Sequence, residues 1–258
     1  MKKSVLMWLL AGLCFGGTPV QAKDFTQATF AETQQAAEQG NAYAQFVLGL
    51  MYALGHKTTP DDRQAATWLR KASEQGVADA QNLLAIMYMK GQGVPQDYRQ
   101  AAVWFRAAAD QGVAEAQFRL GLAYIGGIGV PQDYRQATDW LRKAADQGVA
   151  DAQYQLGLAY INGKGVTQDY RQVATWTRKA AEQGHADAQF LLGLVYSSDR
   201  GVPIDFKLAY VWFSVAAANG NANASAKRDE CAKLLTPSVL ADAQTLAGQY
   251  FEKYQPKT

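Results

Sequence analysis

The sequence predicts an all-α protein built as a solenoid of tandem helix–turn–helix repeats. Two markers recur with a step of 36 residues, and apolar residues between them are spaced three and four apart, as on one helix face. The markers are a glycine (Gly40, Gly76, Gly112, Gly148, Gly184, Gly220) and a tryptophan (Trp68, Trp104, Trp140, Trp176, Trp212). Such an array presents an extended surface shared by neighbouring repeats, which favours binding over catalysis.

Residues 1–22 have the pattern of a secretory signal peptide. Lys2 and Lys3 precede an apolar run over 5–15, and small residues lead to Ala22. The run is shorter than the roughly 20 residues that span a bilayer, so cleavage after Ala22 is favoured over a membrane anchor. We therefore expect an exported protein, periplasmic or secreted, without stable membrane insertion once the signal is removed.

The charge of the expected mature chain argues against nucleic-acid binding. The whole chain has 25 Lys and Arg against 23 Asp and Glu, and the signal segment removes Lys2 and Lys3 but no acid, which leaves 23 against 23. A chain of zero formal charge has no global field to collect phosphates. Its one remaining cysteine, Cys231, cannot form an internal disulfide. It is either a buried small hydrophobe or a free thiol.

The elements follow in order from the marker residues. Residues 23–39 predict an N-terminal capping helix, and five repeats of two helices, A and B, fill 40–220. Helix A has a buried stripe of alanine, leucine and tyrosine, such as Ala116, Leu120 and Tyr124. A glycine within this helix costs about 1 kcal/mol relative to alanine, so its recurrence indicates that another helix backbone passes too close for a side chain. This glycine occurs at Gly49, Gly121, Gly157 and Gly193.

Turn and capping residues place the helix ends. Helix A is expected to end at a Gly-x-Gly loop such as Gly127–Gly129, where glycine can adopt the left-handed conformation. Helix B is expected to begin at an aspartate such as Asp133, with Gln136 at the spacing of a capping box. Residues 221–258 predict C-terminal capping helices, the last of which opens at Thr236–Pro237.

These residues together resemble the Sel-1-like repeat, a relative of the tetratricopeptide repeat. The shared pattern is Ala-x3-Leu-Gly-x2-Tyr-x2-Gly-x-Gly-Val-x2-Asp-x3-Ala-x2-Trp-x3-Ala-Ala-x-Gln-Gly, and it covers about 40–220 in five copies. Lys57 and Asp199 replace loop glycines, which leaves the shape of those two loops open. The resemblance implies a right-handed α-α superhelix with helix A on its concave side. It also implies adaptor roles in the bacterial envelope or in contact with host proteins.

The sequence suggests a protein-binding groove along helix A. Its apolar positions are Phe46, Phe118, Tyr154, Phe190, Leu122, Leu158, Ile125 and Ile161, and its acidic rim includes Glu115 and Asp151. Helical spacing keeps these columns on one face, where a peptide or a helix of an envelope or host protein could bind. Alternatively, the aromatic residues pack between repeats and the acids favour helix starts. The tryptophans, by contrast, have the spacing of core residues, and the helix-B arginines that of a solvated outer face.

The sequence contains little that indicates chemistry. His56 and His185 are the two histidines, and we expect them at a loop and a helix start. Motifs of zinc proteases, α/β-hydrolases and phosphate-binding loops are missing, so we expect no enzyme, no metal and no cofactor. One alternative is a β-lactamase-like or cell-wall hydrolase, as claimed for some cysteine-rich relatives, although Ser-x2-Lys and their paired cysteines are missing here. Another is a structural, self-assembling module.

Overall fold

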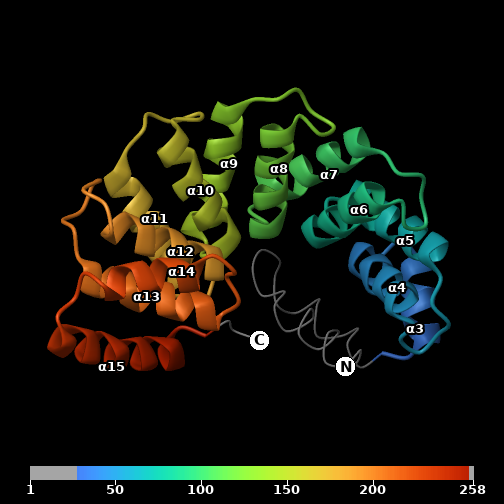
Figure 1. Ribbon diagram of the computed structural model, residues 1–258. Helices are drawn as coiled ribbons and strands as arrows, with labels where there is room; N and C mark the ends of the chain where they lie inside the picture. Colours follow the sequence, from blue (N-terminus) through green and yellow to red (C-terminus); the bar gives the residue numbers. More distant parts are fainter. Residues whose placement is uncertain (1–27, 256–258) are drawn as a thin grey trace. The chain divides into compact units, whose positions relative to one another are not determined.

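The computed structural model describes residues 28–255, and these residues form thirteen α-helices and no strand (Figure 1). The expected signal peptide and the start of the expected capping helix lie outside the described residues. The helices divide into two compact units, the first ending at Gln132 and the second beginning at Asp133. The chain is thus the all-α repeat solenoid that the sequence predicts.

The first unit contains the capping helix and two and a half repeats. Within the unit, consecutive helices pack against one another. They are α3 (Phe30–Glu38), α4 (Ala42–Leu54), α5 (Asp62–Glu74), α6 (Ala78–Lys90), α7 (Tyr98–Asp110) and α8 (Ala114–Gly126). We call α4, α6, α8, α10 and α12 the A helices, and α5, α7, α9, α11 and α13 the B helices.

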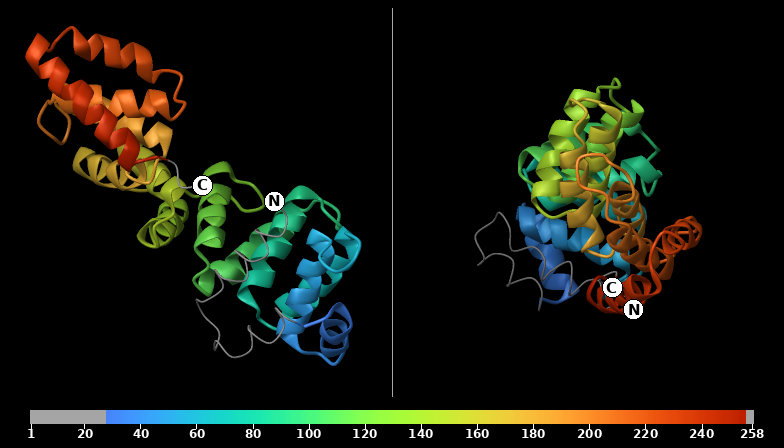
Figure 2. Two further views of the ribbon diagram at one scale, coloured as in Figure 1. Left: turned by 90° about the horizontal axis from the view of Figure 1, so that it is seen from below. Right: turned by 60° about the vertical axis from the view of Figure 1, so that its left-hand side comes forward.

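The second unit completes the array and ends in two further helices. Its helices are α9 (Tyr134–Asp146), α10 (Ala150–Asn162), α11 (Tyr170–Ala181), α12 (Ala186–Tyr196), α13 (Phe206–Ala218), α14 (Ala224–Ala232) and α15 (Pro237–Lys253). The last helix begins behind Thr236, whose hydroxyl accepts from Val239 N. It lies alongside α13, as the orange and red ribbons of Figure 2 show.

The expected aspartate caps form, but the expected capping boxes do not. Asp169, for example, accepts hydrogen bonds from the backbone of Arg171 and Gln172 at the start of α11. Its own N–H donates to the carbonyl of Tyr160 in the preceding A helix. Because the N–H of Asp169 is already bonded, the side chain of Gln172 does not complete a capping box. The reciprocal capping box occurs instead at the start of α3, between Thr29 and Glu32.

The two loops that depart from the repeat behave differently. Lys57, in the position of a loop glycine, keeps a left-handed backbone with φ of 61° and donates to the carbonyl of Ala28. In the last repeat, by contrast, Asp199 replaces the glycine that closes helix A. The helix there ends earlier, at Tyr196, and its C-cap Ser197 is right-handed.

A buried glutamine in each A helix connects neighbouring helices. In α10, Gln153 donates through Nε2 to the carbonyl of Ala145 in α9 at 3.0 Å, and its Oε1 accepts from Gln183 at the end of α11 at 2.8 Å. Equivalent amide–amide contacts occur at Gln45, Gln81 and Gln189. We call this set of buried amides the glutamine ladder. Each of these glutamines follows an alanine in the sequence, and this repeated Ala-Gln pair is the signal that could have predicted the ladder. The ladder was not predicted from it.

The second unit closes the glutamine ladder at its C-terminal end. Gln189 is fully buried and donates to the carbonyls of Ala181 and Tyr254. Asn219 also donates to Tyr254, at 3.3 Å, and to Gln189 Oε1, at 2.9 Å. The carbonyl of Tyr254, just after the last helix, therefore adds an acceptor for both amides at the final step of the ladder.

Replacement of Gln189 tests this closure. We expect Gln189→Leu to lower the free energy of unfolding by about 1 to 3 kcal/mol, because it leaves buried partners of the amide without hydrogen bonds. Urea unfolding followed by circular dichroism measures the change. The exposed Gln244 provides a matched control as Gln244→Leu. Equal unfolding midpoints for the two variants would show that the ladder contributes little.

The glycines within the A helices do allow close approach, although mainly of side chains. A Cβ on Gly193 would lie 2.6 Å from ring atoms of Phe213, and one on Gly157 would lie 2.8 Å from Thr177 Cγ2. At Gly49 backbone of the paired helix also comes near, with Leu69 N at 3.2 Å from an added Cβ. The expected close approach is therefore confirmed, but the atoms nearest to these glycines belong mainly to side chains and not to the backbone.

We expect Gly193→Ala to destabilise the protein by about 1 to 3 kcal/mol, because the buried Phe213 ring has to move. Gly248, on α15, has no atom within 4 Å of an added Cβ. Gly248→Ala should instead stabilise by up to about 1 kcal/mol through helix propensity. Thermal unfolding of both variants checks the opposite signs, and a stabilised Gly193→Ala would contradict the packing argument.

Candidate functional site

The expected binding residues lie on the A helices, but one of them is not available at the surface. Phe46, on α4, is 1% exposed and packs with Tyr43, their ring centroids being 5.7 Å apart. It belongs to a core cluster that includes Ala37 of the capping helix. Because this cluster encloses the ring, we correct its assignment as a surface anchor.

The remaining residues fall into the two units. The first unit contains Glu115, Phe118, Leu122 and Ile125 on α8, all of them partly exposed. The second unit contains Asp151, Tyr154, Leu158 and Ile161 on α10, together with Phe190 on α12. Apart from the exposed Asp151, these are also partly exposed. We call the partly exposed surface of these A helices the helix-A face.

The helix-A face of the first unit is more polar than the sequence columns suggested. Glu115 forms an ion pair with Arg119 one turn later, at 2.6 Å. On α6, Asn82 stands in the aromatic column, and Asp79 stands in the acidic column. Burial raises the pKa of Asp79, since water is partly excluded from its carboxylate.

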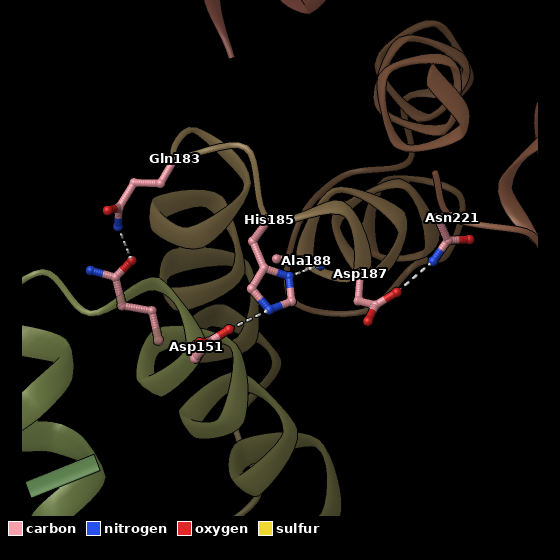
Figure 3. Close-up of polar contacts among 7 residues, drawn as sticks. Asp151, Gln183, His185, Asp187, Ala188 and Asn221 are labelled. Carbon is pink, nitrogen blue, oxygen red and sulfur yellow. Dashed lines mark hydrogen bonds and ion pairs between the residues drawn. The ribbon is translucent and has the colours of Figure 1, made fainter. Parts of the chain in front are cut away.

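His185 makes the second unit different from the repeats before it. The helix starts of α6, α8 and α10 have a valine N-cap without a side-chain hydrogen bond, whereas His185 caps α12. Its Nδ1 accepts from Ala188 N at 3.2 Å, and its Nε2 lies 3.2 Å from Asp151 Oδ1 (Figure 3). The histidine thus joins the starts of two neighbouring A helices.

Tyr154 of α10 lies close to His185 and Asp187. Its ring packs against His185 with centroids 4.7 Å apart. Burial and the nearby charge of Asp187 raise the pKa of its hydroxyl, so the phenol remains protonated near neutral pH. Asp187 in turn accepts from Asn221 Nδ2 at 2.7 Å (Figure 3). The starts of α10 and α12 thus combine two carboxylates, an aromatic ring and a protonated hydroxyl.

Phe190 continues the face on α12. Its ring packs against the fully buried Phe213, with centroids 5.5 Å apart, while part of its surface stays exposed. Leu194 follows one turn later and is also partly exposed. Core packing therefore fixes the position of these side chains and leaves an apolar strip for contact with another molecule.

The B helices contain the residues expected in the core and on the outer face. Trp68, Trp140, Trp176 and Trp212 are buried, as their spacing predicts. Trp104 is partly exposed. A lysine three residues later lies over the ring of Trp68, Trp140 and Trp176. On α7, Ala107 takes the place of this lysine, so the Trp104 ring has no such cover.

One arginine column has a structural role that the sequence did not reveal. Arg70 and Arg142 donate to the hydroxyls of Tyr88 and Tyr160, 18 residues later, at 2.7 and 2.8 Å. Arg106 and Arg178 make the same contact with Tyr124 and Tyr196. These arginines therefore join each B helix to the next A helix.

Three features bear on other functions. Among the described residues, no three His, Cys, Asp or Glu side chains are placed to hold a metal ion. None of the helices in this part of the chain is long and apolar enough to cross a membrane. Cys231 is 4% exposed, and burial raises the pKa of its thiol, which fits the reading as a small buried hydrophobe.

Comparison with known structures shows two similar proteins that are about 40% identical to this chain where they align with it. One is a protective antigen present in uropathogenic Escherichia coli strains and displaying an SLR fold; it has 41% identity and a TM-score of 0.77 over 88% of this chain. The other is a Sel1 repeat protein from Oxalobacter formigenes, with 40% identity and a TM-score of 0.67 over 78% of this chain. The chain spans 49% and 59% of their lengths. A search of curated proteins gave no match.

The family comparison accounts for most of the chain. The Sel1 repeat model matches five consecutive segments, 42–77, 78–113, 114–149, 150–185 and 186–221. Each segment begins with an A helix and ends just after a B helix. Repeats of this kind form scaffolds that typically mediate protein–protein interactions. The chain belongs to the Sel1 repeat family.

Proposed function

We propose that the protein is an exported, non-enzymatic scaffold that binds a peptide or a segment of another protein on its helix-A face. The observation that carries this proposal is the strip of partly exposed apolar side chains on α10 and α12, which includes Tyr154, Leu158 and Phe190. Neither helix capping nor the glutamine ladder requires these side chains. Tyr154 and Phe190 pack partly against the core and keep the rest of their surface exposed, where a partner can make contact.

The mechanism is capture by a preformed surface. The glutamine ladder and the buried Phe213 hold the backbone and the base of Phe190 before a partner arrives. A surface that is already ordered loses little conformational entropy on binding, which favours affinity. Aromatic side chains at such a surface provide a large contact area with few rotatable bonds.

Export is the second part of the proposal. The basic and then apolar pattern of residues 1–22 supports it, and the similar Escherichia coli protein is described as a protective antigen, a property that fits exposure to the host. We assign the periplasm as the site of action, with release from the cell as the alternative. Its partner is then an envelope or host protein.

Export predicts a defined mature N-terminus. Expressed with its full sequence in a Gram-negative host, the protein should appear in the periplasmic fraction with Lys23 as its first residue. Intact-mass spectrometry after osmotic shock measures this. Replacement of the apolar Leu9 and Leu10 by aspartate should keep the protein uncleaved in the cells. Cleavage at another site, or retention of the wild-type chain inside the cell, would contradict the assignment.

Binding predicts sensitivity to truncation of the aromatic residues. Pull-down from envelope and host extracts should recover a partner with wild-type protein, and Tyr154→Ala/Phe190→Ala should weaken its binding about 5- to 30-fold through loss of anchor contacts. Tyr98→Ala/Val103→Ala is the matched control, because both residues are exposed on the B helix α7. Circular dichroism confirms folding. A partner held equally well by the folded Tyr154→Ala/Phe190→Ala protein would rule out this face.

A further inference from the structure

Charges are segregated between the two kinds of helix in the second unit. The only charged side chains on α10 and α12 are Asp151 and Asp187. The lysines and arginines of this unit's repeats lie on the B helices α9, α11 and α13 or in the loops that follow the A helices, at Arg135, Arg142, Lys143, Lys164, Arg171, Arg178, Lys179, Arg200 and Lys207. The helix-A face in this unit therefore contains acids without a basic residue of its own.

Neither acid is neutralised by a lysine or arginine in the described structure. Asp151 contacts Nε2 of His185, whose Nδ1 accepts a hydrogen bond from Ala188 N. Asp187 accepts from the uncharged amide of Asn221. The positive ends of α10 and α12 each offset about half a charge. A net negative potential remains beside Tyr154.

The neighbouring charges do not cancel this potential. On α14, Lys227 and Arg228 form ion pairs with Glu230 and Asp229 of the same helix, at 2.7 and 2.8 Å. On the B helices, Arg142 and Arg178 keep their charges but are held at the hydroxyls of Tyr160 and Tyr196, near the C-terminal ends of α10 and α12, whereas the two acids are at the helix starts. Tyr160 is six residues from Tyr154, and therefore on a different side of α10.

Acids and apolar side chains follow one another along the same two helix faces. On α10, the spacing of three and four residues places Asp151, Tyr154 and Leu158 in one stripe. On α12, Asp187, Phe190 and Leu194 repeat that arrangement. The ring contact between Tyr154 and His185 brings the starts of the two stripes together. The surface is thus apolar along its length and negative at one end.

We propose that this face of the second unit binds a peptide segment in which lysine or arginine adjoins apolar residues. This proposal rests on the proposed function and specifies the partner. The cation is attracted by Asp151 and Asp187, which lie on either side of His185 at the starts of α10 and α12 (Figure 3). The apolar residues contact Leu158, Phe190 and Leu194. An acidic segment would be repelled at the same end, so the charges also select against wrong partners.

A selection experiment tests the chemistry without knowledge of the natural partner. A random peptide library displayed on phage is selected against the mature protein and, in parallel, against Asp151→Asn/Asp187→Asn. The wild-type protein should enrich peptides with lysine or arginine next to aromatic or aliphatic residues, and the variant should lose the enrichment of basic residues. The matched control is Asp139→Asn/Asp146→Asn, which makes the same change of net charge at exposed positions of α9.

Affinities of one selected peptide complete the test. Loss of two exposed ion pairs should weaken its binding to Asp151→Asn/Asp187→Asn about 2- to 30-fold, with little change for the α9 control. Selected peptides without basic residues that still depend on Phe190 would overturn this inference and leave the proposed function intact. A wild-type protein that enriches no peptide sensitive to Tyr154→Ala would overturn both.

Discussion

The glutamine ladder is the interaction on which the stacking of helices depends. One buried side chain, such as Gln153, bonds the B helix before it through Ala145 and the end of the B helix after it through Gln183. Apolar contacts alone tolerate small shifts between helices, whereas a buried amide without its partner is costly. The ladder therefore selects one spacing of the helices, and the small residues of the core fit that spacing.

The sequence predicted the features that depend on local spacing, and it did not predict those that depend on contacts between separate helices. Glycine, aspartate and tryptophan recur because helix ends and core contacts recur, so the helices and most buried rings were predictable. The capping boxes were wrong, because the N–H of residues such as Asp169 bonds a tyrosine carbonyl in another helix. That bond depends on the packed structure. The ladder was visible as a repeated Ala-Gln pair, but its partners lie 30 residues away, beyond local patterns.

The candidate site was less predictable, for a physical reason. Its position on helix A follows from helical spacing, but the exposure of each side chain depends on neighbouring helices. Phe46 and Phe190 occupy the same column, yet the first is buried with the capping helix and the second keeps an exposed edge. His185 likewise acquires its role from Asp151, which is 34 positions earlier and on another helix. Departures from the repeat indicate where to look, and the packed structure determines what is accessible.

The charge pattern of the second unit arises from the needs of the fold itself. The B helices use lysines over their tryptophan rings and arginines against tyrosine hydroxyls. The A helices use acids at their starts, where the helix dipole favours them. Cations and anions are thus placed on different surfaces before any partner is considered. In the first unit, Arg119 pairs with Glu115 and reduces this difference. In the second unit, Gln155 and Leu191 stand in the position of Arg119, so the face of α10 and α12 remains negative. If the proposed peptide binding holds, a single column of the repeat changes which peptides the scaffold accepts without changing how it folds.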